Sequence, residues 1–189
     1  MKNKMSAIVA VFSIMSVICL GCGPSLNSDG SVNSVFAYVD HDRTLAEMIK
    51  AGKYDFVYYD KDIVEKNFPI HQPSNNVWPP IGIEFVLVHL DKTASTNEVF
   101  QYMDEHDLWP AWIEELLAFG EEFPDVQRDF PIIAFGSSCV ASDGYPRAPY
   151  LANSNGFYRY LSLTSFLTYS SLDDSPVWHE SCRFLAVHK

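Results

Sequence analysis

Positively charged residues are scarce in this 189-residue chain. It holds 13 Lys and Arg against 24 Asp and Glu, giving a formal net charge of −11, and its basic residues form no run. Because an acidic chain repels phosphate backbones and anionic headgroups, this balance argues against nucleic acid as a partner and against binding of the folded domain to an anionic membrane surface. Internal repeats are also missing, and the length suits one domain with a real core.

Motifs for metal binding and serine catalysis are missing as well. The six histidines are scattered, and none forms an H-x-x-x-H pair. The Asp-His-Asp segment at 40–42 lacks the spacing of a ligand set, so we predict no metal site there. The Gly-Ser-Ser segment at 136–138 lacks the G-x-S-x-G elbow and the strand-to-helix turn that a nucleophilic serine requires.

A histidine and a cysteine lie close together in the segment HESC, at His179 and Cys182. A thiol beside an imidazole base is a nucleophile pattern. In an extended strand, however, positions three residues apart point to opposite faces, so the two side chains would not meet. We therefore predict no catalytic residue in this segment, and none elsewhere in the chain.

Cysteines are few, and they fall into two groups. Cys19 and Cys22 belong to the N-terminal segment, which leaves Cys139 and Cys182 in the folded part. In an exported protein such a pair is a candidate disulfide, whereas two buried free thiols would behave as small hydrophobic side chains. The sequence leaves both alternatives open, because it does not give the distance between the two Cα atoms.

The N-terminal segment, residues 1–21, reads as a bacterial secretory signal. Lys2 and Lys4 precede a run without charge that ends at Leu20, shorter than the roughly 20 residues of a membrane-spanning helix. Gly21 before Cys22 resembles the lipobox of exported lipoproteins, although Cys19 occupies the position where Leu is usual. We expect lipidation of Cys22, export, and attachment to the cell membrane through this lipid, facing the periplasm or the cell exterior. An uncleaved N-terminal anchor is the alternative.

Three further regions follow the signal. Residues 22–43 begin with Gly, Ser and Asn and are expected to form a flexible tether. Residues 44–81 are expected to form an N-terminal extension: a helix at 44–51 with a Thr44–Glu47 capping box, then a short strand at 54–59. Residues 82–189 are expected to form the main domain.

Within the main domain, the pattern predicts an α+β fold. In residues 82–90, both alternating sets of side chains are largely apolar. This pattern indicates a strand that is covered on both faces. Helices are predicted at 96–106, where Ser95 and Glu98 can form a capping box, and at 112–121, where Glu114 and Glu115 are assigned to the solvated face. Further strands are predicted around 131–140, 150, 158–163 and 183–188, between long loops.

Three segments carry a resemblance to known proteins: WPAWIEELLAFG from Trp109, AFGS from Ala134 and RFLAV from Arg183. They resemble the RPATxxELLALG, ALGS and RFLAV segments of a family of small, uncharacterised bacterial exported proteins. The order strand, helix, extended link, helix, strand, long loop, strand is similar to that of C-type-lectin-like domains. The resemblance implies two helices packed on a small, mostly antiparallel sheet with long loops, preceded here by an extra helix.

Departures from these patterns limit what the resemblance implies. Trp112 stands where the family has a Thr that would cap the following helix, and loss of such a cap costs about 1 kcal/mol. The Glu-Pro-Asn and Trp-Asn-Asp calcium signatures of C-type lectins are absent. Asp173 and Asp174 could supply carboxylate oxygens to Ca²⁺, but adjacent acids beside Ser and Pro are also ordinary turn residues, so we predict no cofactor.

Aromatic residues in the loops give the most specific hint of function. Tyr145, Tyr150, Tyr169 and Trp178 are of the types that dominate recognition surfaces, and Tyr158 and Tyr160 share one face of a predicted strand. The sequence leaves open the alternative that half of these aromatic residues belong to the core, with their hydroxyls directed to water. We therefore expect a binding module for a protein or glycan ligand, with Asp173 and Asp174 nearby. The alternatives are a cell-envelope hydrolase that uses acidic residues and a purely structural envelope protein.

Overall fold

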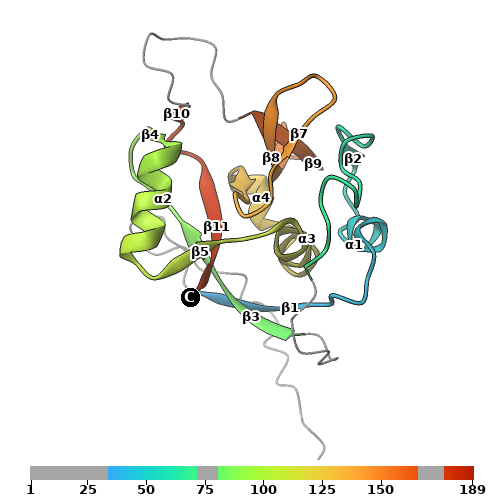
Figure 1. Ribbon diagram of the computed structural model, residues 1–189, viewed down its shortest axis with the longest axis horizontal. Helices are drawn as coiled ribbons and strands as arrows, with labels where there is room; N and C mark the ends of the chain where they lie inside the picture. The colour runs from blue at the N-terminus through green and yellow to red at the C-terminus, as the bar shows by residue number, and fades with distance from the viewer. Residues whose placement is uncertain (1–33, 72–80, 166–176) are drawn as a thin grey trace, which may run out of the picture.

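The computed structural model describes residues 34–71, 81–165 and 177–189, and these form one α+β domain around a mixed sheet (Figure 1). Its main path runs in the order β1-β3-β11-β6-β8-β9-β2, with β5 beside β11 and β7 beside β8. The strands of this sheet are β1 (Val35–Val39), β2 (Phe56–Val57), β3 (Ile81–Val88), β5 (Leu108–Pro110), β6 (Ile132–Ile133), β7 (Cys139–Val140), β8 (Pro146–Ser154), β9 (Tyr158–Ser165) and β11 (Arg183–His188). The short strands β4 (Ala94–Ser95) and β10 (Val177–Trp178) pair separately.

Helices cover both faces of the sheet. They are α1 (Leu45–Ala51), α2 (Thr96–Glu105), α3 (Ile113–Glu122) and α4 (Val126–Asp129). Figure 1 shows α2 on one side of β11, and α3, α4 and α1 on the other. Among the described residues, no helix is long and apolar enough to span a bilayer.

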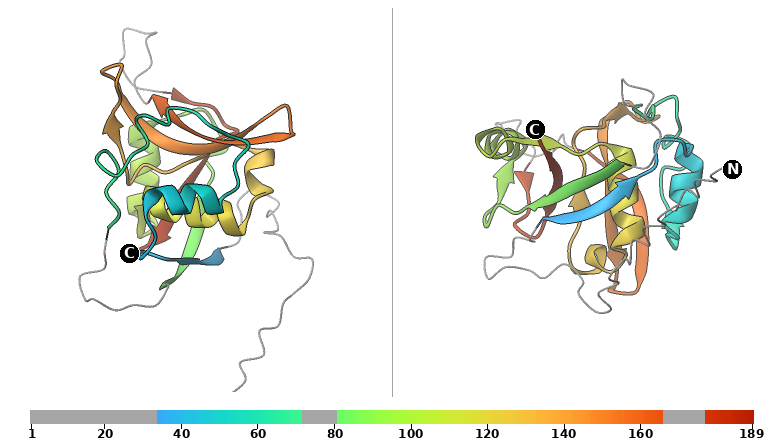
Figure 2. Two further views of the ribbon diagram at one scale, coloured as in Figure 1. Left: turned by 90° about the vertical axis from the view of Figure 1, so that its right-hand side faces the viewer. Right: turned by 90° about the horizontal axis from the view of Figure 1, so that it is seen from below.

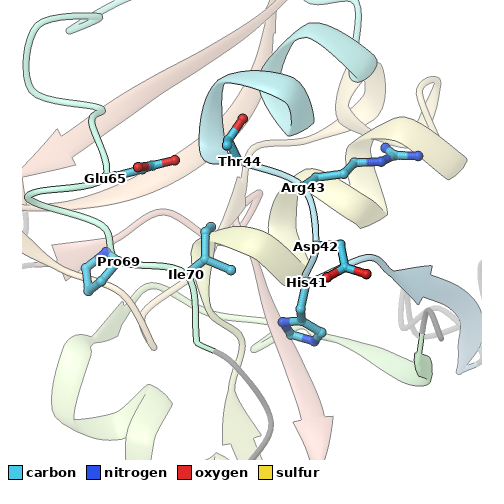
Figure 3. A pocket seen from close by; sticks show the side chains of 7 residues that line it. All are labelled: His41, Asp42, Arg43, Thr44, Glu65, Pro69 and Ile70. Atoms are coloured by element: carbon cyan, nitrogen blue, oxygen red, sulfur yellow. The ribbon is translucent and has the colours of Figure 1, made fainter. Parts of the chain in front are cut away.

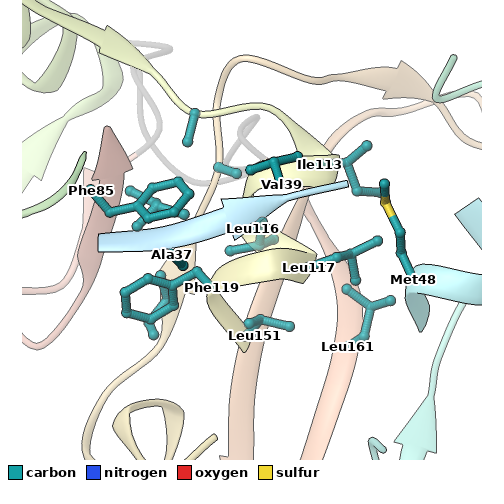
Figure 4. Packing of buried hydrophobic residues seen from close by; sticks show 14 of the residues in the cluster. Ala37, Val39, Met48, Phe85, Ile113, Leu116, Leu117, Phe119, Leu151 and Leu161 are labelled. Carbon is teal, nitrogen blue, oxygen red and sulfur yellow. The ribbon is translucent and has the colours of Figure 1, made fainter. Parts of the chain in front are cut away.

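Two hydrophobic clusters result from the alternation of side chains along the strands. In β11, Leu185 enters the larger cluster beneath α3, whereas Phe184 and Ala186 enter the smaller cluster beneath α2. Figure 4 shows the larger cluster, where Leu116 and Leu117 of α3 lie between β1 and the β8–β9 pair. The strand predicted at 82–90 likewise contributes to both clusters, with Phe85 and Leu87 in the larger one and Val88 in the smaller one.

The predicted helices 44–51 and 96–106 are confirmed, and so are their capping boxes. Thr44 accepts a hydrogen bond from the backbone of Glu47, whose carboxylate accepts one from Thr44 N–H at 2.8 Å. Ser95 and Glu98 make the same pair of bonds at the start of α2. Each box satisfies two backbone donors that the helix itself leaves free.

The start of α3 is capped from another part of the chain. Trp112 gives no side-chain cap, but Ser137 Oγ accepts the hydrogen bond of Ile113 N–H at 2.8 Å. Gly136 allows this approach, since a Cβ there would lie 2.5 Å from the Pro110 carbonyl oxygen. The AFGS segment therefore caps the helix of the WPAWIEELLAFG segment, and Ser137 is a structural residue.

Several boundaries predicted from the sequence are wrong. Residues 35–39 belong to a strand rather than to the tether, because VFAYV pairs along β3. The region 44–81 is not an appended extension: β2 pairs with β9, and α1 packs against α3. The strand expected at 131–140 is two short strands, β6 and β7, separated by the segment that caps α3. The sheet is consequently larger than the small one expected.

Candidate functional site

Five aromatic rings form a continuous line across β2, β9 and β8, which we call the aromatic row. Tyr158 contacts Phe56 with ring centroids 5.7 Å apart, and Phe56 stacks on Tyr58 at 5.9 Å. Tyr58 then contacts Tyr160 at 5.4 Å, and Tyr160 contacts Tyr150 at 5.9 Å. Edge-to-face and offset contacts at these distances are the preferred geometries of aromatic pairs.

Strand register places these rings on one face of the sheet. Phe56 pairs with Tyr160 in the parallel β2–β9 ladder, and Tyr150 lies opposite Ser162 in the antiparallel β8–β9 ladder. The neighbouring residues Leu161 and Leu163 point the other way, into the larger cluster. The aromatic row therefore lies on the face opposite α3, beyond the part of that face that packs beneath α2.

The row is accessible and carries no formal charge. Phe56, Tyr58 and Tyr158 are 45%, 48% and 52% exposed. Tyr150 is half-buried at the end of the row, where burial, followed by its hydrogen bond with Tyr160, raises the pKa of the Tyr150 hydroxyl. This surface therefore offers flat rings and hydroxyl groups to a ligand.

The residues predicted to bind a ligand lie in three different environments. Tyr150 belongs to the aromatic row, and Tyr145 is exposed in the turn before β8, where its N–H donates to Asp143. Trp178 is a core residue rather than a surface aromatic: it packs on Phe135, and its Nε1 donates to Thr96 Oγ1 at 2.9 Å. Four predicted site residues lie outside the described residues: Cys22, Tyr169, Asp173 and Asp174.

Of the row, Tyr150 is a predicted ligand-binding residue and Tyr158 and Tyr160 are predicted to share one strand face, whereas Phe56 and Tyr58 are not predicted. They lie two positions apart in the segment predicted as a short strand, so they share one face of it. Hydrogen bonds from Asp55 N–H to Arg159 C=O and from Tyr58 N–H to Leu161 C=O, both 2.9 Å long, fix this segment on β9. The period-two spacing was visible in the sequence, but the neighbouring strand was not.

A buried carboxyl group forms a second polar site at the start of α3. Glu114, assigned to the solvated face, is only 1% exposed, so this assignment is wrong. Its Oε1 lies 3.0 Å from both the backbone nitrogen and the ring Nδ1 of His71, while its Oε2 has no partner among the described residues. His71 lies against the first turn of α3 and covers Glu114. A helical wheel shows only the residues of the helix itself, so it cannot reveal this coverage.

Burial controls the protonation of this second site. It raises the pKa of Glu114 and, together with the nearby His41, lowers the pKa of His71. The contact is therefore a hydrogen bond between groups biased toward their neutral forms, despite its ion-pair distance. Burial also raises the pKa of Glu115 to about 7, although this carboxylate accepts a 2.7 Å hydrogen bond from Trp112 N–H.

A cavity of about 330 Å³ lies between the turn before α1 and the segment that leads to His71 (Figure 3). Arg43 at its rim is held by Asp40 and Glu121, at 3.3 and 2.7 Å. Among the residues that the structure describes, no three His, Cys, Asp or Glu side chains are grouped to hold a metal ion. The lining residues are His41, Asp42, Arg43, Thr44, Glu65, Pro69 and Ile70.

The two cysteines of the domain are free thiols. Cys139 packs against the larger cluster and Cys182 against the smaller one, and burial raises the pKa of both. Of the two alternatives, the structure therefore has free thiols rather than a disulfide. The HESC segment is a turn in which Cys182 N–H donates to His179 C=O, and the His179 ring contacts Ser181 instead of the thiol.

Comparison of the chain with protein-family models, with curated proteins and with solved structures finds no match.

Proposed function

We propose that this protein is an exported, lipid-anchored module with a C-type-lectin-like domain, which binds a neutral glycan through the aromatic row. The observation that carries the proposal is the continuous contact of five rings on one face of the sheet, three of them about half exposed. Aromatic rings bury much area at little entropic cost, which suits them to recognition.

Charge and ring chemistry favour a glycan among the ligands considered. The chain is acidic, which disfavours anionic polymers as ligands. The aromatic row itself is uncharged, so it offers no opposite charge to a charged peptide. The faces of aromatic rings carry a negative quadrupole, which attracts the C–H groups on the faces of a sugar ring. The hydroxyl groups of the four tyrosines can exchange hydrogen bonds with sugar hydroxyls.

Retention of the protein on neutral polysaccharides tests this proposal. Cellulose and chitin suspensions and gels that contain soluble glucans are the probes. Tyr58→Ala and Tyr158→Ala are expected to weaken retention at least tenfold, whereas Phe157→Ala, an exposed aromatic outside the row, should leave it unchanged. Failure of the wild-type protein to bind any of these glycans, or equal retention of all variants, would overturn the proposal.

Export and anchoring are supported by the N-terminal sequence, and they have their own test. Mass spectrometry of the mature N-terminus is expected to find Cys22 as the first residue, with its thiol and amine carrying lipid. An unmodified Cys22 would refute the anchor without affecting glycan binding.

A second candidate function, hydrolysis, rests on the pairing of His71 with Glu114. A buried carboxyl group that fixes an imidazole is a recurring arrangement in general acid–base catalysis. The test is to incubate the protein with a glycan that it retains and to measure new reducing ends, with His71→Ala as the control. Release by the wild-type protein alone would support this function, and no release by either would exclude it for that glycan.

A further inference from the structure

Strand β1 lies at an edge of the sheet, and its sequence is nearly symmetric. Val35–Val39 reads VFAYV, with an aromatic residue on each side of Ala37 and a valine at each end. Among the described residues β1 pairs only with β3, which leaves the backbone groups along its other edge to a partner (Figure 2, right).

The side chains of this edge are unusually exposed for their type. Phe36 and Tyr38 are 67% and 74% exposed, whereas Ala37 and Val39 between and beyond them are buried in the larger cluster. The strand contains no charged residue and no proline, which are the usual devices that prevent edge-to-edge pairing. The ring of Tyr38 lies over Gly82 of β3, where an added Cβ would be 3.4 Å from Tyr38 Cε1.

We propose that β1 pairs antiparallel with β1 of a second copy of this chain, about a two-fold axis at Ala37. In this register Phe36 lies opposite Tyr38 of the second copy, and Val35 lies opposite Val39. The same residues serve both copies, as a two-fold interface requires. Directly opposed aromatic pairs are among the most stabilising cross-strand pairs of antiparallel sheets.

The buried area predicts a weak dimer. Four aromatic rings of about 150–250 Å² each, roughly seven tenths of which is exposed, would bury on the order of 400–700 Å². Even with the added backbone pairing, the interface is small beside the roughly 1,200–2,000 Å² of stable complexes, so the dimer is expected to be weak. β1 and the aromatic row lie at opposite ends of the sheet, so a dimer would carry two free rows and would gain avidity on a polymeric ligand.

Cysteine cross-linking tests both the pairing and its register. Phe36→Cys and Tyr38→Cys chains are mixed, oxidised mildly, and analysed by mass spectrometry of disulfide-linked peptides. The two-fold register predicts the mixed disulfide in at least fivefold excess over either symmetric one, because only the mixed pair lies directly opposite. Sedimentation of the unmodified chain should show a dimer that Phe36→Glu weakens at least tenfold.

Three outcomes would overturn the proposal. They are equal yields of mixed and symmetric disulfides, no cross-link at residues 36 and 38, and a monomer at all concentrations reached. Circular dichroism of each variant verifies folding, which these exposed positions should not disturb. Glycan retention does not enter the readout, so failure here leaves the proposed function untouched.

Discussion

The two faces of the β8–β9 pair differ, although alternate residues of the same two strands form both of them. On the face beneath α3, Leu151, Leu161 and Leu163 are buried in the larger cluster. On the opposite face, Tyr158 is exposed, and Tyr150 and Tyr160 are only partly buried. The first face stabilises the fold, whereas the exposed rings of the second face can change with little effect on stability. This difference is the physical basis for assigning binding to the aromatic row.

The largest expected effect is the loss of a buried side chain on the first face. Leu161 is fully buried, so Leu161→Ala should lower the free energy of unfolding by about 2–5 kcal/mol through lost burial and a residual cavity. Denaturant unfolding measures this change. Thr164→Ala, a partly exposed position of the same strand, is the matched control. A loss below about 1 kcal/mol at Leu161 would contradict the difference between the faces.

A smaller but substantial effect is expected from the buried guanidinium of the first face. Arg159 donates to Gly120 C=O at 2.9 Å, near the end of α3, and to Gln127 Oε1 at 3.3 Å. Arg159→Met keeps much of the apolar stem but leaves these buried acceptors without a donor, at a cost of about 1–3 kcal/mol. Arg128→Met, at a more exposed position, should cost less in the same unfolding assay.

Stability is expected to depend on pH through the helix that covers the first face. Burial raises the folded-state pKa of Glu115 from 4.5 to about 7, so the folded state holds this proton more tightly than the unfolded state. The resulting stabilisation is fully present below pH 4.5 and is lost as pH rises through 7. The loss is on the order of 1–3 kcal/mol.

The measurement compares unfolding free energies at pH 5 and pH 7.5 in the wild-type protein and in Glu115→Gln. The variant, which cannot ionise, should show a smaller decrease between the two values. The raised pKa of Glu114 also makes stability fall as pH rises, and it does so in both proteins. The lowered pKa of His71 has the opposite effect in both, because it makes stability fall as pH drops below 6.5. An equal decrease in both proteins would remove Glu115 as a cause.

The smallest effect on stability is expected on the second face. Tyr58→Ala and Tyr158→Ala remove half-exposed rings, so each should change the free energy of unfolding by no more than about 1 kcal/mol while glycan retention falls. Unfolding and retention assays on the same preparations measure both quantities. A large loss of stability would show that the aromatic row belongs to the core.

The sequence alone predicted the local elements well. Both capping boxes, the α+β class, the strand at 82–90 and the last strand follow from short-range patterns, since a cap or an alternation involves residues a few positions apart. Trp178 was misplaced because the same aromatic residue can occupy a recognition surface or a core. Its partners Thr96 and Phe135 are distant in sequence, so no local pattern gives its burial.

Tertiary structure alone decided which residues meet. Sequence determined that Phe56 and Tyr58, and likewise Tyr158 and Tyr160, share one face of a strand, because side chains alternate along any strand. Only the parallel pairing of β2 with β9 joins these two pairs into one row. In the same way, Ser137 caps α3 and His71 covers Glu114 across separations of 24 and 43 residues. Local chemistry fixes the elements, whereas contacts between distant segments are fixed by how the elements pack around the sheet.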